Sequence, residues 1–323
     1  MIKRADLHAH TRFSLWKHLK IIKPRDSYET PMDLYERCKQ MGMDFVAITD
    51  HDTIDGALDL LSRRPDLEPE IIVGEEVETH FPDTGQWVHV NVFDLDEPTH
   101  REIVRLKANV YDLVAYLRQR RLLFVLNHPF QSYRLQKPAS EFLDEILELF
   151  DHFEVGNATL PASHNKVVAE LIDHAVALHA RKIGLGGSDA HNLRNVGLYW
   201  TEAPVDAAAG KREWLAAVAR GEARAVGRAK GVASLTADVY RIIGRYYLSL
   251  LDPEVRSQMR TENYLAAAAL VPACAAGLPA FLNAGNRLRL EAVTQHLRRS
   301  LRSKRRSNRV GLTSRDLIED RPE

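Results

Sequence analysis

Short apolar runs alternate along most of the chain with stretches of helical periodicity. Seven runs are rich in β-branched residues or glycine, as buried strands are, and most are followed by apolar residues at three- and four-residue steps. This alternation predicts βα units and a parallel sheet, because parallel strands need a helical crossover between them. The predicted strands are residues 2–7, 45–49, 71–74, 87–93, 122–126, 152–156 and 182–185.

The predicted helices have recognisable starts and apolar faces. Thr30 followed by Pro31 is typical of an N-cap and a first helical position, and predicts a helix through Gly42. Residues 163–180 and 206–220 repeat the helical spacing. One further helix is predicted from a face made by Ile103, Leu106, Val110, Leu113 and Leu117.

Side chains that can bind metal stand at or near the end of almost every predicted strand. In a closed parallel barrel all strand carboxyl ends open on one face, where barrel enzymes build their sites. An open doubly wound sheet instead gathers its site at one switch point. Seven strands with such residues throughout favour the barrel. The residues are His8, His10, His51, Glu76, His89, His128, Asp189 and His191.

These residues stand in six short segments that occur in a fixed order. The first has two histidines at i and i+2, which lie on one side of an extended chain and can bind one ion together. The segments are residues 6–11, 48–53, 74–77, 88–90, 127–129 and 187–191. With all six in order, the sequence resembles the PHP family, named for polymerase and histidinol phosphatase, whose members are metal-dependent phosphoesterases.

The resemblance covers about the first two-thirds of the chain and implies a fold and a set of metal ligands. The fold is α/β, a distorted (β/α)7 barrel over residues 1–225 with a C-terminal helical extension over 226–323. The cofactors are two or three divalent ions of zinc, manganese or iron, which imidazole and carboxylate ligands suit. The implied ligands are His8, His10, Glu76 and Asp189 for the first ion, Glu76, His89 and His128 for the second, and His51 and His191 for the third.

One position departs from the family pattern. The family commonly has an acidic residue shortly after the second histidine, whereas this chain has Leu15, which cannot bind metal. His18 is the candidate replacement, with an ordinary loop histidine as the alternative. Asp6, Asp50 and Asp52 are expected to accept the second N–H of the histidine rings and so to fix their tautomers.

Catalysis and substrate binding have fewer candidates. Asp189 and His191 are the predicted proton carriers, with Asp50 as a further catalytic candidate. A basic loop follows the first strand, and Arg12 and Lys17 are expected to bind a substrate phosphate, with solvated loop charges as the alternative. Arg194 is a further phosphate candidate. The roles of Glu154 and Asn157, at the end of the sixth strand, are left open.

Composition bears on the partner class and on the cellular compartment that we expect for the protein. The chain of 323 residues has 44 basic and 44 acidic side chains, so net charge gives no firm indication of a nucleic-acid partner. Two cysteines are too few for a disulfide framework, and Met1 leads directly into a strand with no apolar leader. We therefore expect a cytoplasmic protein.

The last hundred residues carry none of the six motif segments. An amphipathic helix is expected before Asp252 and Pro253, and residues 264–282 are free of charge and rich in alanine. A buried helical hairpin is the preferred interpretation, and a membrane association through this region is the alternative. The basic residues that follow are expected to form a disordered, solubilising tail.

The sequence therefore predicts a hydrolase that cleaves a phosphomonoester or phosphodiester, in a small molecule or a nucleotide, with a metal-activated hydroxide. An amidohydrolase-like enzyme is the first alternative, since His-x-His on a barrel also occurs there, although no lysine ends a middle strand. A non-catalytic regulatory or scaffold domain is the second alternative, supported mainly by Leu15.

Overall fold

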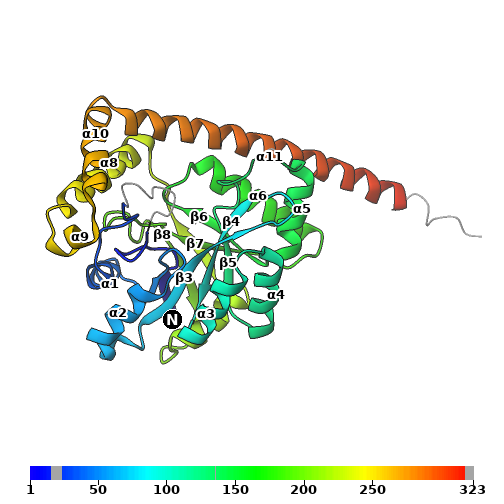
Figure 1. Cartoon of the computed structure of the whole chain (residues 1–323). Coiled ribbons are helices and arrows are strands. Elements are labelled where there is room, and N and C mark those ends of the chain that lie inside the picture. Colours follow the sequence, from blue (N-terminus) through cyan, green and yellow to red (C-terminus); the bar gives the residue numbers. More distant parts are fainter. Residues whose placement is uncertain (16–23, 135, 317–323) are drawn as a thin grey trace, which may run out of the picture.

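All seven predicted strands form, and two more follow them in the chain (Figure 1). The computed structural model describes residues 1–15, 24–134 and 136–316. The strands are β1 (Ile2–Asp6), β2 (Phe45–Ile48), β3 (Ile71–His80), β4 (Trp87–Phe93), β5 (Phe124–Asn127), β6 (His152–Asn157), β7 (Ile183–Gly187), β8 (Tyr199–Pro204) and β9 (Arg224–Gly227).

The helices cover the outside of the sheet and continue beyond it. Thr30 caps α1 as predicted, because its hydroxyl accepts the Asp33 N–H at 3.1 Å and Pro31 is the first helical residue. The α-helices are α1 (Pro31–Gln40), α2 (Asp55–Arg63), α3 (Glu97–Leu106), α4 (Val110–Arg120), α5 (Ala139–Leu149), α6 (Ala162–Ala177), α7 (Lys211–Ala219), α8 (Val232–Ser249), α9 (Pro253–Gln258), α10 (Thr261–Ala275) and α11 (Leu278–Asp316).

The sheet is mixed, so the prediction of an entirely parallel sheet is wrong. Its strand order is β7-β6-β5-β4-β3-β2-β1-β8-β9. Strands β1 to β3 are parallel to one another, as are β5 to β7, whereas β4 runs antiparallel to both of its neighbours. A short turn after His80 joins β3 to β4, which leaves no room for the helix that a parallel connection requires.

The two ends of the sheet approach each other and nearly close a barrel. The Thr201 hydroxyl of β8 bonds both the N–H and the C=O of Gly186 in β7, at 2.9 Å each. A parallel bridge also joins Ala9 to Ala190, just beyond β1 and β7. Glycine permits this approach, because a Cβ on Gly186 would lie 2.7 Å from the Trp200 carbonyl oxygen. The predicted distorted barrel is thereby confirmed.

Two helices occupy the segment for which one helix was predicted. Helix α3 ends at Leu106, and Asn109 caps α4 by accepting the Tyr111 N–H at 3.0 Å. The apolar face is nevertheless shared, because Ile103 and Leu113 are both buried in the main core. The single-helix prediction is therefore wrong about the break and right about the buried face.

Helix α11 packs against the barrel and does not form the disordered tail that was predicted. Figure 1 shows it crossing one end of the barrel, from α8 to α5. Leu297 and Leu301 are buried in the main core, and the Arg298 Nε donates to Glu170 at 2.8 Å. Docking through both apolar and charged contacts makes the described part of this basic region a structural element of the barrel.

The preceding apolar segment forms the corner between two helices, so the predicted buried helical hairpin is wrong in both its geometry and its burial. Helices α10 and α11 meet at an angle of 74°, while Leu265 and Phe281 are 67% and 74% exposed. In the described residues, no single helix has the length and apolarity to cross a membrane, and the bent α10–α11 pair meets that criterion by length and composition only. The domain division at residue 225 stays a prediction.

Candidate metal centre

The Glu76 carboxylate lies at the centre of the predicted ligand cluster. It extends from β3, is 1% exposed, and presents one oxygen to three imidazoles. Glu76 Oε2 is 3.2 Å from His8 Nε2, 3.4 Å from His10 Nε2 and 3.1 Å from His51 Nδ1. Residues separated by up to 68 positions along the chain thus meet because β1, β2 and β3 are parallel neighbours whose ends lie together.

The second oxygen of Glu76 faces the other half of the cluster. Glu76 Oε1 is 3.1 Å from His89 Nδ1 and 2.9 Å from His128 Nε2, and it accepts the Asn127 amide N–H at 2.9 Å. Because β4 is antiparallel, His89 reaches this face from near the start of its strand, not from the end. A carboxylate with imidazoles on both oxygens has the arrangement that a ligand bridging two metal ions requires.

Asp189 closes the cluster on the side of β7. Its Oδ1 lies 3.5 Å from the Nε2 atoms of both His8 and His10. Its Oδ2 accepts the Thr159 hydroxyl at 2.9 Å and the Asn157 amide at 3.2 Å, which leaves Oδ1 for the histidines. This answers part of what the sequence left open, because Asn157 supports Asp189.

Asp26 supplies the carboxylate that the sequence seemed to lack at Leu15. Its Oδ2 is 3.0 Å from His51 Nε2 and 2.9 Å from His191 Nε2. An antiparallel bridge pairs Leu15 with Arg25, and the Asp26 N–H donates to the Ser14 carbonyl oxygen, so Asp26 sits beside the histidine segment. Leu15 itself is 52% exposed. His18 lies outside the described residues, so its predicted role as a replacement ligand stays a prediction.

The donor set fits divalent metal ions. Four groups of three side chains have ligand atoms that all lie within 4.8 Å of one another. The buried Nε2 atoms of His8, His10 and His89 have no hydrogen-bond partner in the described residues. Unpartnered buried nitrogens are rare, and metal coordination explains three of them at once. The groups are His8-His10-Glu76, His8-His128-Asp189, His51-Glu76-His89 and His10-His51-His191.

Charge within the cluster sets the protonation of its members. Burial lowers the pKa of His8, but Glu76 and two further carboxylates outweigh burial and raise it well above its usual value. Burial and the neighbouring His191 lower the pKa of His10 to about 3. Burial raises the pKa of Glu76, but the surrounding imidazoles together have a larger effect in the opposite direction. The pKa of Glu76 therefore lies well below its usual value. Glu76 is thus ionised and His10 neutral, the forms that bind metal, whereas His8 is protonated without an ion and would have to release its proton to bind one.

Polar groups behind the histidines orient the rings. Glu154 Oε1 lies 2.8 Å from His8 Nδ1, and the Ser14 hydroxyl lies 3.2 Å from His10 Nδ1. Partners on Nδ1 turn Nε2 toward the cluster, which is how proteins fix a metal-binding tautomer. Glu154 also accepts the His128 backbone N–H at 3.0 Å. The role of Glu154, which the sequence left open, is therefore to hold two histidines in place.

The aspartates predicted to hold imidazoles bind other groups. Asp50 accepts the Thr11 N–H at 2.6 Å and the Thr11 hydroxyl at 2.7 Å, and Asp6 accepts the Gly197 N–H at 2.9 Å. Asp52 lies 2.6 Å from Lys107 Nζ. These carboxylates lie where the strands turn, and turns present backbone N–H groups that need acceptors. Burial raises the pKa of both Asp6 and Asp50 to about 6. A catalytic role for Asp50 stays a prediction.

Three residues of the site hold left-handed backbone conformations that are uncommon outside glycine. The φ angles are 54° at Asp52, 27° at His128 and 53° at Asp189. Such conformations cost of order 1–3 kcal/mol each and persist only where surrounding contacts enforce them. Because all three residues lie beside the ligand cluster, we infer that this loss of stability is tolerated in exchange for the orientation of these side chains.

The cluster opens to solvent on one side. The side chains of His8 and His10 are 1% and 0% exposed, whereas those of His51, His89 and His191 are 18%, 12% and 20% exposed. Solvent therefore reaches the cluster from the side of these last three histidines.

The predicted phosphate-binding residues have no demonstrated role. The Arg12 guanidinium lies 5.6 Å from the centre of the Phe13 ring. The backbone carbonyl oxygen of Arg12 accepts a hydrogen bond from the guanidinium of Arg25. The Arg194 side chain is exposed, and its backbone N–H donates to Asn192. Lys17 lies outside the described residues. Substrate binding by these three residues stays a prediction.

Two family models match the chain. The model described as the PHP domain matches residues 6–149, and the model described as PHP-associated matches residues 175–222. Together the two models include every proposed ligand of the cluster. They leave out Glu154, Asn157 and Thr159, whose side chains contact those ligands. An uncharacterized protein of Methanocaldococcus jannaschii, MJ1587, is 36% identical over 80 residues, a match that spans 24% of this chain and 44% of that protein.

Solved structures resemble the chain more distantly. A provisionally assigned metal-dependent phosphoesterase of Bifidobacterium adolescentis is 16% identical, with a TM-score of 0.44 over 58% of this chain and 87% of that one. An amidohydrolase of Chromobacterium violaceum, solved with sulfate and no metal, is 16% identical, with a TM-score of 0.44 over 63% of this chain and 92% of that one. Likenesses at this level carry no functional argument.

Proposed function

Because this chain belongs to the PHP domain family, a family of metal-dependent hydrolases, we propose that it hydrolyses a phosphate ester with the help of divalent ions. The observation that carries the proposal is the Glu76 carboxylate with imidazoles on both of its oxygens, where three buried histidine nitrogens contact carboxylates without forming a hydrogen bond within the described residues. Divalent ions in such a set lower the pKa of a bound water and neutralise phosphate oxygens.

The chain's own residues have separable tasks in this proposal. Glu76 and Asp189 hold the ions, while Glu154 and Ser14 keep the rings of two ligand histidines in orientation. The two buried carboxylates would offset only part of the positive charge of the ions, so a bound ester dianion would meet a cationic site. We propose His191, on the open side and near Asp26, or Asp189 as the group that passes a proton to the leaving alcohol, in the state in which that side chain is not bound to an ion.

The substrate class is a small-molecule or nucleotide phosphate ester. The histidines on the open side lie within one small cluster, so ions held there would be within reach of the oxygens of one phosphate group. Arg12 and Arg194 are proposed contacts for the remaining phosphate oxygens. Zinc, manganese and iron all suit the imidazole and carboxylate set, and the native ion is a matter for elemental analysis.

The test combines metal content with a substrate panel. The full chain is purified, its metals are counted by mass spectrometry, and phosphomonoesters, phosphodiesters, an amide and a lactone are offered. We expect bound divalent ions and hydrolysis of a phosphate ester, with losses of at least about 100-fold in His8→Ala and Glu76→Gln because both remove direct ligands. His80→Ala is the matched control, since His80 ends the same strand as Glu76 and its side chain is 41% exposed.

Other outcomes contradict separate parts of the proposal. Protein that takes up no divalent ion contradicts the metal centre. Cleavage of the amide or lactone but of no phosphate ester leaves the hydrolase class standing and contradicts the substrate. Bound metal without hydrolysis of any member of the panel favours a regulatory role.

A further inference from the structure

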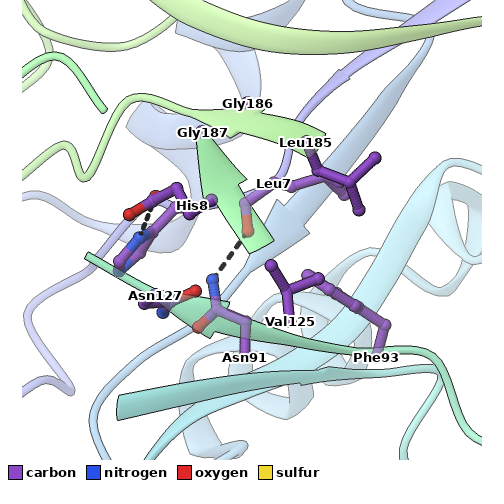
Figure 2. A pocket seen from close by; sticks show the side chains of 10 residues that line it. Leu7, His8, Asn91, Phe93, Val125, Asn127, Leu185, Gly186 and Gly187 are labelled. Atoms are coloured by element: carbon purple, nitrogen blue, oxygen red, sulfur yellow. Dashed lines mark hydrogen bonds and ion pairs between the residues drawn. The ribbon is translucent and has the colours of Figure 1, made fainter. Parts of the chain in front are cut away.

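The cavity that Figure 2 shows inside the barrel is too small for an organic ligand. It lies between Leu7, Asn91 and Val125, and its volume is about 10 Å³, whereas pockets for small molecules have about 300–1,000 Å³. A larger feature, with no role in the proposed hydrolysis, lies on the outside of the molecule. It is the corner at which α10 meets α11, at the outer edge of the fold in Figure 1.

Exposed apolar side chains gather at this corner. The sequence has no charged residue between Glu262 and Arg287, and the chain turns from α10 into α11 at Gly277, whose φ is 91°. Single exposed apolar residues are ordinary, whereas a group of them marks an interaction surface. The large apolar residues exposed around the turn are Leu265 (67%), Val271 (48%), Phe281 (74%), Leu282 (58%) and Leu288 (72%).

The outward face of α11 changes from apolar to cationic along the helix. Five exposed residues follow one another at steps of seven, four, seven and three positions, so they lie on one side of the helix. They are Phe281, Leu288, Ala292, Arg299 and Arg302. The helix axis rises about 27 Å from Phe281 to Arg299, at about 1.5 Å per residue. One continuous face thus carries apolar side chains at its start and arginines farther along.

The opposite face of α11 is already occupied by the barrel. Leu290, Leu297 and Leu301 repeat at steps of seven and four residues and are buried, and the Arg298 Nε donates to Glu170 at 2.8 Å. The outward face can therefore bind a partner while α11 stays docked, without a change in the fold.

The partner of this face must be apolar at one end and anionic at the other. Glu291 is the only acidic residue in positions 278–305, and it faces α6, where it accepts the Ser163 hydroxyl at 2.6 Å. A second copy of α11 laid on this face therefore offers no carboxylate to Arg299 and Arg302. A bilayer with anionic lipids offers both acyl chains and phosphates. We propose that the α10–α11 corner inserts into one leaflet of an anionic lipid bilayer, with α11 along the surface and its two outward arginines on lipid phosphates.

Co-sedimentation of the full chain with lipid vesicles tests the proposal. We expect binding to vesicles of phosphatidylcholine with phosphatidylglycerol, and weaker binding to vesicles of phosphatidylcholine alone. Each arginine near an anionic surface strengthens partitioning by about fivefold, so Arg299→Gln combined with Arg302→Gln should weaken binding to the anionic vesicles by about 25-fold. The same pair should have little effect on vesicles of phosphatidylcholine alone, which carry no net charge.

A second pair of substitutions tests the apolar half of the face. Phe281→Gln combined with Leu288→Gln should weaken binding to both kinds of vesicle by at least about 10-fold, because both side chains would lose their transfer from water into the bilayer. Both residues are more than 70% exposed, so the variant should fold like the parent protein. The matched control is Ile2→Gln combined with Val104→Gln, which replaces apolar side chains that are 48% and 45% exposed in β1 and α3. Its binding should stay within about twofold of the parent's, because it removes no apolar area from the proposed contact.

Several results would overturn this assignment. They are a full chain that does not bind anionic vesicles, vesicle binding that either pair of α11 substitutions leaves unchanged, and an equal loss of binding in the control. A dimer in sedimentation velocity that Phe281→Gln with Leu288→Gln dissociates, in protein that binds no vesicles, identifies a second copy as the occupant and overturns it too. Vesicle binding needs neither a bound metal ion nor an ester, so its failure and that of the proposed hydrolysis are distinguishable.

Discussion

The contribution of Asp26 to the third ion is a prediction that the structure makes directly. Asp26→Asn removes one negative charge and leaves the size of the side chain unchanged. The carboxylate contacts two imidazoles, at 2.9 Å to His191 and 3.0 Å to His51. These contacts belong to the metal-free site, and an ion at the two imidazoles would contact the carboxylate in their place. Removing a group that supports a metal site typically costs about 10–100-fold in metal affinity.

Solvent screens this position only in part. The side chains of Asp26, His51 and His191 are 17%, 18% and 20% exposed, so we expect the upper end of that range. The third ion should then bind about 100-fold more weakly, which corresponds to about 2.8 kcal/mol at about 1.4 kcal/mol for each tenfold change. Mass spectrometry of dialysed protein should then find one ion fewer per chain than in the parent protein.

Two further variants make the result specific. Asp33→Asn is the control, because Asp33 lies in the first turn of α1 and contacts Thr30 and not the cluster. Leu15→Asp combined with Asp26→Asn should not restore the ion, because Leu15 is 52% exposed and the bridge to Arg25 holds its backbone beside the site, not in it. Unchanged metal content and affinity in Asp26→Asn would refute the reasoning, as would recovery through Leu15→Asp.

Three more predictions concern the barrel. Leu297→Ala should destabilise the protein to urea by about 2–5 kcal/mol, because the side chain is fully buried, whereas Leu288→Ala, 72% exposed, should change stability by less than about 0.5 kcal/mol. Burial lowers the pKa of His164 to about 3, so the unfolded chain binds the extra proton. Stability is then full above pH 6.5 and falls toward pH 3 by about 1.4 kcal/mol per unit, and His164→Gln should flatten this fall in urea titrations across that range. Gly187→Ala would place a Cβ 2.5 Å from the Cβ of His8 and should lower both the melting temperature and the metal affinity. Gly244→Ala is the control, because a Cβ there would have no atom within 4 Å, and it should change neither.

The strands and the ligand positions could be predicted because their signals are local. The apolar pattern of a segment such as Trp87–Phe93 predicts an extended strand without reference to other parts of the chain. The histidine within it can likewise be recognised as a candidate ligand without knowing which strands lie beside it. The direction of that strand was also available: only six residues separate it from His80, with Gly85 in the turn at a φ of 65°. Such a short connection cannot hold a crossover helix, so its length alone indicates an antiparallel strand.

Asp26 could not be found by spacing, because the ligand was sought directly after His10. The signal that identifies it is its position just before the Thr30 cap of α1, where the chain returns to the barrel. The docking of α11 is harder to predict from sequence. The pair between Arg298 and Glu170 joins residues 128 positions apart, and a basic helix with an apolar stripe does not specify which surface it covers.

The bridge between Leu15 and Arg25 has a consequence for the order in which the cluster can assemble during folding. It joins residues that lie close together in the sequence, and it brings Asp26 beside the Ser14 carbonyl oxygen. Contacts between residues near in sequence cost less chain entropy than contacts between distant ones, so they can form early. The carboxylate of Asp26 can therefore reach the histidine segment through a local contact, whereas Glu76 reaches it only once β1, β2 and β3 have paired.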